Sequence, residues 1–140
     1  MAAPARALLS DLSTGYEFPT ATFELTQDYV DEYLAATNDQ NDIYSETGLA
    51  PPLAVAARAL GMLLDVVELP SGSLHTGQEV EMKAGVPVPS TLELVGRLAR
   101  RSMRAGLVIA VLEFQVSLQG RDTPALVGRT TVMMTLWRLE

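Results

Sequence analysis

The longest hydrophobic run in the chain predicts a buried helix near its middle. Between Val55 and Val67 the only polar side chains are Arg58 and Asp65, and a helix that is apolar nearly all round is buried on most of its surface. At about 13 residues the run is too short to cross a bilayer, so we expect the rest of the chain to wrap it. A polar loop rich in Asn and Asp precedes it at residues 37–49, and a loop held by a rigid element is a natural place for chemistry.

Alternating patterns on both sides of this helix predict β-strands. The alternating segments are residues 16–25, 74–88, 91–100, 107–119 and 125–139, with a tight connection at 102–106. Period-2 alternation is typical of half-buried strands. Residues 26–36 instead place apolar residues at helical spacing after Thr26, a good N-cap. We therefore predict an α+β fold in which one antiparallel sheet wraps around one long central helix. Residues 1–15 are expected to be flexible and residues 16–140 to form a single domain.

The strand predicted at 107–119 indicates a partner. In its first half both faces are apolar, with Leu107, Ile109 and Val111 on the face that turns polar further along. We expect the central helix to cover one face there and a partner subunit the other. The edges of an open sheet also need protection, and edge-to-edge pairing of two protomers is the usual remedy. The pattern predicts a dimer.

Composition narrows the possible functions. The chain has 140 residues, a net charge of −7 and a pI near 4.6, which argues against nucleic-acid binding because that needs a basic face. It has no cysteine and one histidine, so no thiol nucleophile, metal cluster or redox cofactor is expected. No signal peptide or membrane span is recognisable, and we expect a cytoplasmic protein.

One cationic cluster stands out in this acidic chain. Arg97, Arg100, Arg101 and Arg104 lie close together in the sequence. They are either the solvated end of a strand and its hairpin or a landing site for the phosphates of a carrier thioester, since arginine suits phosphate oxygens.

Three short segments resemble one known family. The residues YLAATND at 33–39, APP at 50–52 and LHTGQE at 74–79 are similar to the MaoC-like branch of the hot-dog superfamily, the (R)-specific enoyl-thioester hydratases and dehydratases. The resemblance covers the chain from Tyr16 to its end. It implies the hot-dog fold, in which an antiparallel sheet curls around one long helix.

The family's catalytic signature is an aspartate followed five residues later by a histidine. Here Asp39 occupies the aspartate position, Asn41 and Ile43 match, and Tyr44 replaces the histidine. A phenol with a pKa near 10 is a poor base at neutral pH but a usable hydrogen-bond donor. The resemblance thus implies a site in which Asp39 acts as base and Tyr44 as donor to an oxyanion. The alternative is that Tyr44 only packs where the histidine has been lost and that the site is inactive.

The resemblance also implies positions that bind substrate. The family takes an oxyanion donor from a backbone N–H at the start of the central helix; Pro52 has none, so Leu53 or Ala54 would serve. Asn41 lies in the catalytic loop, and Met62 would line an apolar tunnel for the acyl chain. His75, on the next strand, occupies a position that the branch often fills with histidine without catalytic duty.

Several functions stay open at this point. The first is an enzyme that acts on an acyl or polyketide-type (thio)ester by proton transfer, as a lyase of the hydratase or dehydratase type or as a relative repurposed for isomerisation or cyclisation. Its substrate would arrive on CoA, on an acyl carrier protein or free. The second is a non-catalytic hot-dog subunit that shapes the acyl channel of a heteromeric dehydratase. The third is a simple acyl-thioester binding or regulatory module, which only the arginine cluster supports. The first two imply a homodimer or a heterodimer with another hot-dog chain.

Overall fold

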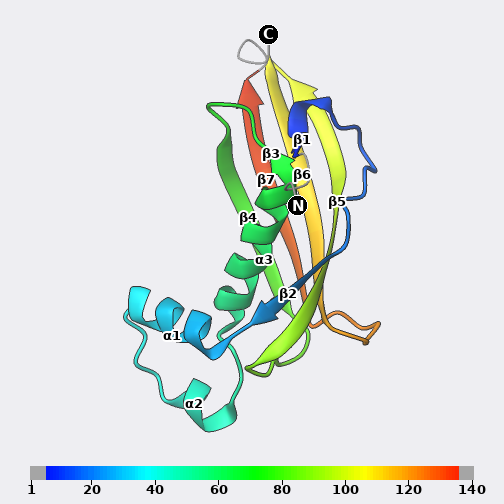
Figure 1. The fold of residues 1–140 in the computed structure, drawn as a ribbon. Coiled ribbons are helices and arrows are strands. Elements are labelled where there is room, and N and C mark those ends of the chain that lie inside the picture. Colours follow the sequence, from blue (N-terminus) through cyan, green and yellow to red (C-terminus); the bar gives the residue numbers. More distant parts are fainter. Residues whose placement is uncertain (1–5, 136–140) are drawn as a thin grey trace.

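A five-stranded antiparallel sheet curls around one side of a central helix (Figure 1). The computed structural model describes residues 6–135. Its elements are β1 (Ala7–Leu8), a 3-10 turn (Leu9–Asp11), β2 (Ala21–Leu25), α1 (Gln27–Ala36), α2 (Ile43–Thr47), α3 (Pro52–Val66), β3 (Val67–Glu68), β4 (Leu74–Met82), β5 (Ser90–Arg104), β6 (Leu107–Leu118) and β7 (Leu126–Thr135). The strand order is β2-β5-β6-β7-β4, which confirms the predicted α+β fold.

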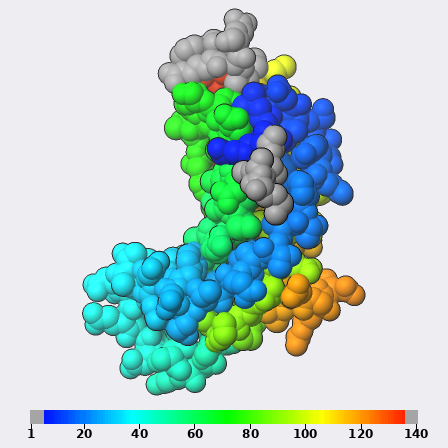
Figure 2. Space-filling view, viewed as in Figure 1, coloured from blue at the N-terminus to red at the C-terminus, as the bar shows by residue number. Residues whose placement is uncertain are grey.

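The N-terminal half enters the sheet and then leaves it as a helical lobe. β2 starts at Ala21 and not at residue 16, because Pro19 lacks the N–H that a continuous ladder needs. The predicted cap is confirmed, since the Thr26 side chain accepts a hydrogen bond from the Tyr29 N–H at 3.1 Å. Figures 1 and 2 show that α1 and α2 project together from one end of the sheet.

In the hairpin between β5 and β6, the strand β5 is longer and the turn is shorter than the sequence predicted. β5 runs to Arg104, so only Ala105 and Gly106 form the turn, with φ angles of 52° and 79°. Such left-handed pairs match the twist of the flanking strands. The register shifts between Leu98 and Arg100, and this bulge interrupts the alternation that would have marked β5 as one long strand.

The central helix α3 is buried on one face only. Its buried residues are Ala54, Val55, Ala56, Ala59 and Leu63, whereas Leu53 is 61 % exposed. The prediction of burial over most of the helix surface was therefore wrong for the single chain. The sheet covers one side, and much of the other side consists of small residues such as Ala57 and Gly61, which expose little apolar area.

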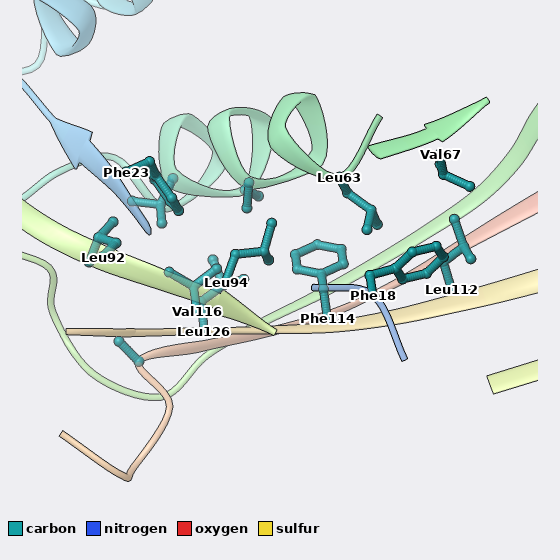
Figure 3. Close-up of a cluster of buried hydrophobic side chains, with 14 of the residues drawn as sticks. Phe18, Phe23, Leu63, Val67, Leu92, Leu94, Leu112, Phe114, Val116 and Leu126 are labelled. Carbon is teal, nitrogen blue, oxygen red and sulfur yellow. The ribbon is translucent and has the colours of Figure 1, made fainter. Parts of the chain in front are cut away.

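The core lies between α3 and the concave face of the sheet (Figure 3). Phe114 stands on the central strand β6 and points towards the helix, where Leu63 faces the sheet. Its neighbours on the two adjacent strands are Gly96 and Gly128. Two glycines beside one phenylalanine leave room for the ring beneath the helix.

Residues near the N-terminus contact the far end of α3. β1 pairs in parallel with β3, and Leu9 is fully buried in the core. Residues 6–15 thus carry defined structure within the segment that the sequence marked as flexible, and residues 1–5 lie outside the described part. The last predicted strand is present as β7, with residues 136–140 likewise outside. Within 6–135, no helix is long and apolar enough to cross a membrane.

Candidate functional site

The end of α1 fixes the position of Asp39. Asn38 adopts a left-handed backbone conformation with φ 53°. The Asp39 N–H then reaches back to the Leu34 carbonyl at 2.9 Å, and the Asn38 N–H reaches the Ala35 carbonyl at 3.2 Å. This pair of bonds is a Schellman motif, which closes a helix and sets the direction of the chain that leaves it. Asp39 is the first residue after that closure, so its backbone is held by the helix.

Two side-chain turns lead from Asp39 into the short helix α2. The Asp39 carboxylate accepts a hydrogen bond from the Asn41 N–H, and the Asn41 side-chain oxygen accepts one from the Ile43 N–H, each at 3.0 Å. Asx turns of this kind shape a loop without help from distant parts of the chain. α2 was not predicted. It ends at Gly48 in a left-handed conformation with φ 69°.

Asp39, Asn41 and Tyr44 come together on one pocket of about 420 Å³. The pocket lies between α1 and the loop that carries α2, and its other lining residues are Gln27, Val30, Asp31, Leu34, Gln40, Ser45, Gly48, Leu49 and Val88. Its wall therefore combines the apolar face of α1 with carboxylate, amide and hydroxyl groups. Such a mixture of apolar surface and a few polar groups is typical of small-molecule sites.

The surroundings of Tyr44 keep its hydroxyl protonated. Partial burial raises the pKa of the phenol above its ordinary value of 10.0, and the charge and hydrogen bonding of the neighbouring Asp39 carboxylate raise it further. Tyr33 adds a smaller effect in the same direction. At neutral pH the phenol is consequently a hydrogen-bond donor next to the Asp39 carboxylate.

A second hollow of about 200 Å³ lies on the other side of Tyr44. Its lining is almost entirely apolar and consists of Ile43, Tyr44, Thr47, Leu49, Ala50, Pro52, Met82 and Gly85. We call it the apolar hollow. Sequence analysis missed it, because Met82 and Gly85 come from the end of β4 and the loop after it. Hydrogen bonds from the Ala50 N–H to the Val86 carbonyl, at 2.8 Å, and from the Val88 N–H to the Gly48 carbonyl, at 2.9 Å, join this loop to the loop that carries Tyr44.

The start of α3 offers one free backbone donor. The Ala54 N–H donates to the Pro51 carbonyl at 3.0 Å, whereas Leu53 N–H has no backbone acceptor within residues 6–135. Of the two predicted oxyanion donors, Leu53 is thus the one still available. The Tyr29 hydroxyl donates to the Ala54 carbonyl at 3.0 Å and ties α1 to this first turn.

Met62 and His75 lie apart from the other predicted site residues. Met62 is half-buried against the core and lines neither the pocket at Asp39 nor the apolar hollow. His75 is exposed, and its Nε2 lies 3.1 Å from the Gln78 side-chain oxygen. It stands seven residues along β4 from Met82, on the order of 20 Å at the usual rise of a strand. Within one chain, His75 cannot contact a ligand bound at Asp39.

The arginine cluster also lies away from the pocket. Arg97 binds Glu113 at 2.8 Å on the outer face of the sheet, and Arg101 donates to the Leu12 carbonyl at 3.2 Å. Arg97 lies at the middle of β5 and Arg101 beyond it, and this strand ends at the opposite end of the sheet from α1 and α2 (Figure 1). The geometry favours a structural role for these two side chains over phosphate binding beside Asp39.

A further hollow of about 450 Å³ lies over the outer face of the sheet. Its charged groups already satisfy one another, since Glu113 bridges Arg97 and Arg129, and Arg129 also reaches Glu79 at 3.4 Å. We therefore place the candidate chemistry at Asp39 and Tyr44. In the described part of the chain, no three His, Asp or Glu side chains are grouped so as to hold a metal ion.

Comparison with solved structures identifies the fold. No model of a known protein family matches the sequence, and a search of curated proteins finds no match. The (R)-hydratase from A. caviae involved in PHA biosynthesis superimposes with a TM-score of 0.70 at 20 % identity, over 87 % of this chain and 96 % of that one. The MaoC-like dehydratase from Rhodospirillum rubrum gives 0.72 at 15 % identity, over 91 % and 95 %.

A heteromeric complex is similar as well. The HadBC (3R-hydroxyacyl-ACP dehydratase) complex from Mycobacterium tuberculosis gives a TM-score of 0.67 at 15 % identity, over 85 % of this chain and 93 % of that one. The chain therefore has the hot-dog fold of the MaoC-like dehydratases and (R)-hydratases, as its sequence motifs predicted. At these identities the comparison establishes the fold, and the activity has to be argued from the site.

Proposed function

We propose that this chain is a MaoC-like hydratase or dehydratase that acts on an acyl or polyketide-type (thio)ester by proton transfer. The observation that carries the proposal is the shared pocket of Asp39 and Tyr44, which occupy the positions of the family's aspartate and histidine. Asp39 accepts the proton next to the carbonyl, and Tyr44 donates a hydrogen bond to the oxygen that becomes negative. We propose the free N–H of Leu53, at the positive end of α3, as a second donor.

Because Tyr44 replaces the histidine, the site suits chemistry that needs one base and one hydrogen-bond donor. Addition of water by the family's usual route uses a group that titrates near neutral pH, and a phenol with a raised pKa does not. Isomerisation or cyclisation of an activated ester needs no attacking water and fits the pair better. The reaction is therefore proton transfer near an activated carbonyl, with water addition as one of its forms.

Turnover of a short trans-2-enoyl thioester by the purified chain tests the proposal. We expect loss of the enoyl absorbance to stop in Asp39→Asn and to slow at least about tenfold in Tyr44→Phe, because removal of one oxyanion donor costs that much or more. Tyr44→His restores the family pair and should increase water addition. Full activity in Asp39→Asn would exclude Asp39 as the base.

A second function is favoured by two observations. Tyr44 stands where the family has histidine, and HadBC and the ChsH1–ChsH2 complex from Mycobacterium tuberculosis, both heteromeric by name, are structural neighbours. In this alternative the chain is a non-catalytic subunit that shapes the acyl channel of a partner with the intact Asp/His pair. Such a subunit would be silent alone and active with its partner, and Asp39→Asn would leave the activity of the complex unchanged.

We propose that either form is dimeric and works in the cytoplasm without a metal or redox cofactor. β2 and β4 are the open edges of the sheet within the described chain, and open edges favour pairing with a second hot-dog chain. Light scattering after size exclusion distinguishes the cases. A stable homodimer supports the self-sufficient enzyme, whereas a monomer that dimerises only with a second hot-dog chain supports the subunit.

A further inference from the structure

We infer that the site takes a small uncharged ester or thioester whose short apolar tail lies in the apolar hollow, and that phosphate-bearing carriers bind poorly. This inference rests on the proposed function, because it places the reacting end of the ligand at Asp39 and Tyr44.

The tail has no described cavity along the central helix. Leu63 is 1 % exposed and packs towards Gly96, where an added Cβ would lie 3.2 Å from its Cδ1. Met62, the residue expected in an acyl tunnel, lines none of the hollows near the site. When the reacting end of the ligand lies at Tyr44, its apolar tail therefore has to extend away from the central helix.

The apolar hollow offers that direction. It shares Tyr44 and Leu49 with the pocket at Asp39, so one ligand can reach from one cavity into the other. Its volume of about 200 Å³ equals roughly six or seven water molecules at ~30 Å³ each. A tail of similar size, a short alkyl chain or a single ring, fits this space.

Gly85 sets the size of the hollow. A Cβ at this position would lie 2.9 Å from Leu49 Cδ1 and 3.1 Å from Cδ2. The backbone of Gly85 is outside the left-handed region, and the three atoms nearest to an added Cβ all belong to the Leu49 side chain. A larger residue would push Leu49 and fill the cavity. Gly85 is therefore a specificity-determining position.

The charges around the site disfavour phosphate. Between Thr26 and Ala50 the chain carries Asp28, Asp31, Glu32, Asp39, Asp42 and Glu46 and no Lys or Arg. No Lys or Arg lines either of the two cavities. Arg58 stands over the Phe23 ring at 5.4 Å, and Lys83 binds Glu81 at 2.8 Å. A ligand with several phosphates would meet a negative field without a Lys or Arg in the lining of either cavity.

Binding of two saturated thioesters tests the inference without any reaction. Hexanoyl-N-acetylcysteamine and hexanoyl-CoA carry the same acyl group, and only the second carries phosphates. We expect the CoA ester to bind at least about tenfold more weakly to the full chain in calorimetry at low salt. The difference in affinity between the two esters should decrease at high salt, where charge repulsion is screened. Equal or tighter binding of the CoA ester at low salt would overturn the inference, as would no binding of either ester.

The hollow is tested by Gly85→Leu, with Gly61→Leu as its matched control. Gly61 lies on α3 with no heavy atom within 4 Å of an added Cβ, so its replacement changes no cavity. We expect Gly85→Leu to weaken the uncharged ester about tenfold, the equivalent of roughly two buried methylene groups, and Gly61→Leu to leave it unchanged. If Gly85→Leu does not fold, Met82→Ala enlarges the same hollow and should strengthen binding of the octanoyl ester relative to the hexanoyl ester.

The two proposals fail in different ways. If Gly85→Leu binds the ester with unchanged affinity while Asp39→Asn loses activity, the proposed function is supported. The apolar hollow is then excluded as the site of the tail. If Gly85→Leu and the CoA phosphates weaken binding as expected but the chain turns over no substrate, the ligand site is supported and the proposed catalysis is excluded.

Discussion

Phe114 occupies the space that any side chain at position 128 would need. A Cβ built on Gly128 would lie 2.7 Å from both Cε atoms of the phenylalanine ring, although the two residues sit side by side on β6 and β7. The ring points towards α3 (Figure 3). This relationship keeps the middle of the sheet close to the helix.

Gly128→Ala should therefore destabilise the chain. An added methyl group has no space beside the rigid ring, and overpacking of this kind costs about 1–3 kcal/mol of unfolding free energy. Urea unfolding measures the loss. Gly61→Ala is the control and should stabilise by about 0.5–1 kcal/mol, since it adds a helix former in open space. In a Phe114→Leu background Gly128→Ala should cost less, and the same cost in both backgrounds would disprove the steric explanation.

Asp39→Asn and Asp39→Ala should separate chemistry from structure. An asparagine oxygen can still accept the hydrogen bond from the Asn41 N–H, so Asp39→Asn should lose activity and keep nearly full stability. Asp39→Ala also removes the acceptor and should lower the unfolding free energy by about 0.5–1.5 kcal/mol. Enoyl-thioester turnover and thermal unfolding of the two variants provide the comparison. A loss of stability in Asp39→Asn as large as in Asp39→Ala would contradict the loop geometry.

Glu113→Gln should change the response of stability to acid. Hydrogen bonds from Arg97 first and Arg129 second hold the pKa of the Glu113 carboxyl below its ordinary value of 4.5. Because the folded pKa is the lower one, its stabilisation is present above about pH 4.5 and is lost as the pH falls through the folded pKa. Glu113→Gln should cost on the order of 1 kcal/mol at neutral pH and flatten the stability curve below pH 4.5.

Glu93→Gln is the matched control for this ion pair. Glu93 stands on β5 next to β6 and forms no ion pair in the described part of the chain. Its replacement should leave the unfolding free energy at neutral pH, and the fall of that free energy in acid, as they are in the native chain. If the unfolding free energy falls equally below pH 4.5 in the native chain and in Glu113→Gln, the two arginines do not stabilise the carboxylate.

Tyr44 should ionise later than a free tyrosine. Its raised pKa places the transition above pH 10.0, so the hydroxyl is protonated throughout the neutral range. The tyrosinate absorbance of the native chain minus that of Tyr44→Phe isolates this group. In Asp39→Asn the transition should move down, because the neighbouring negative charge is gone. A Tyr44 transition below pH 10.0 would contradict the contact with Asp39.

Local features of the site were readable in the sequence. Thr26 caps α1 as predicted, and the Asp39, Asn41 and Tyr44 positions form one loop whose turns depend on residues two apart. The alternating segments became strands, but the pattern overestimated β2, which starts at Ala21, and β4, which ends at Met82, and it missed the bulge in β5. These features were predictable because contiguous residues encode them.

Contacts between distant segments were not readable in this way. The apolar hollow needs Met82 and Gly85 beside Tyr44, and the choice of Leu53 over Ala54 depends on one carbonyl at Pro51. His75 follows the central helix closely in sequence, yet it lies at the start of β4, and the strand then runs on to Met82 at the apolar hollow.

The sequence by itself determined the hot-dog arrangement, the helix cap and the placement of Asp39 and Tyr44 on one loop. Periodicity and short-range turns carry that information along contiguous residues. Only the tertiary structure decided which face of α3 is buried, which N–H is free and which cavities adjoin Tyr44. Those depend on strand register and on side chains from separate segments filling the same space, and no local pattern records either.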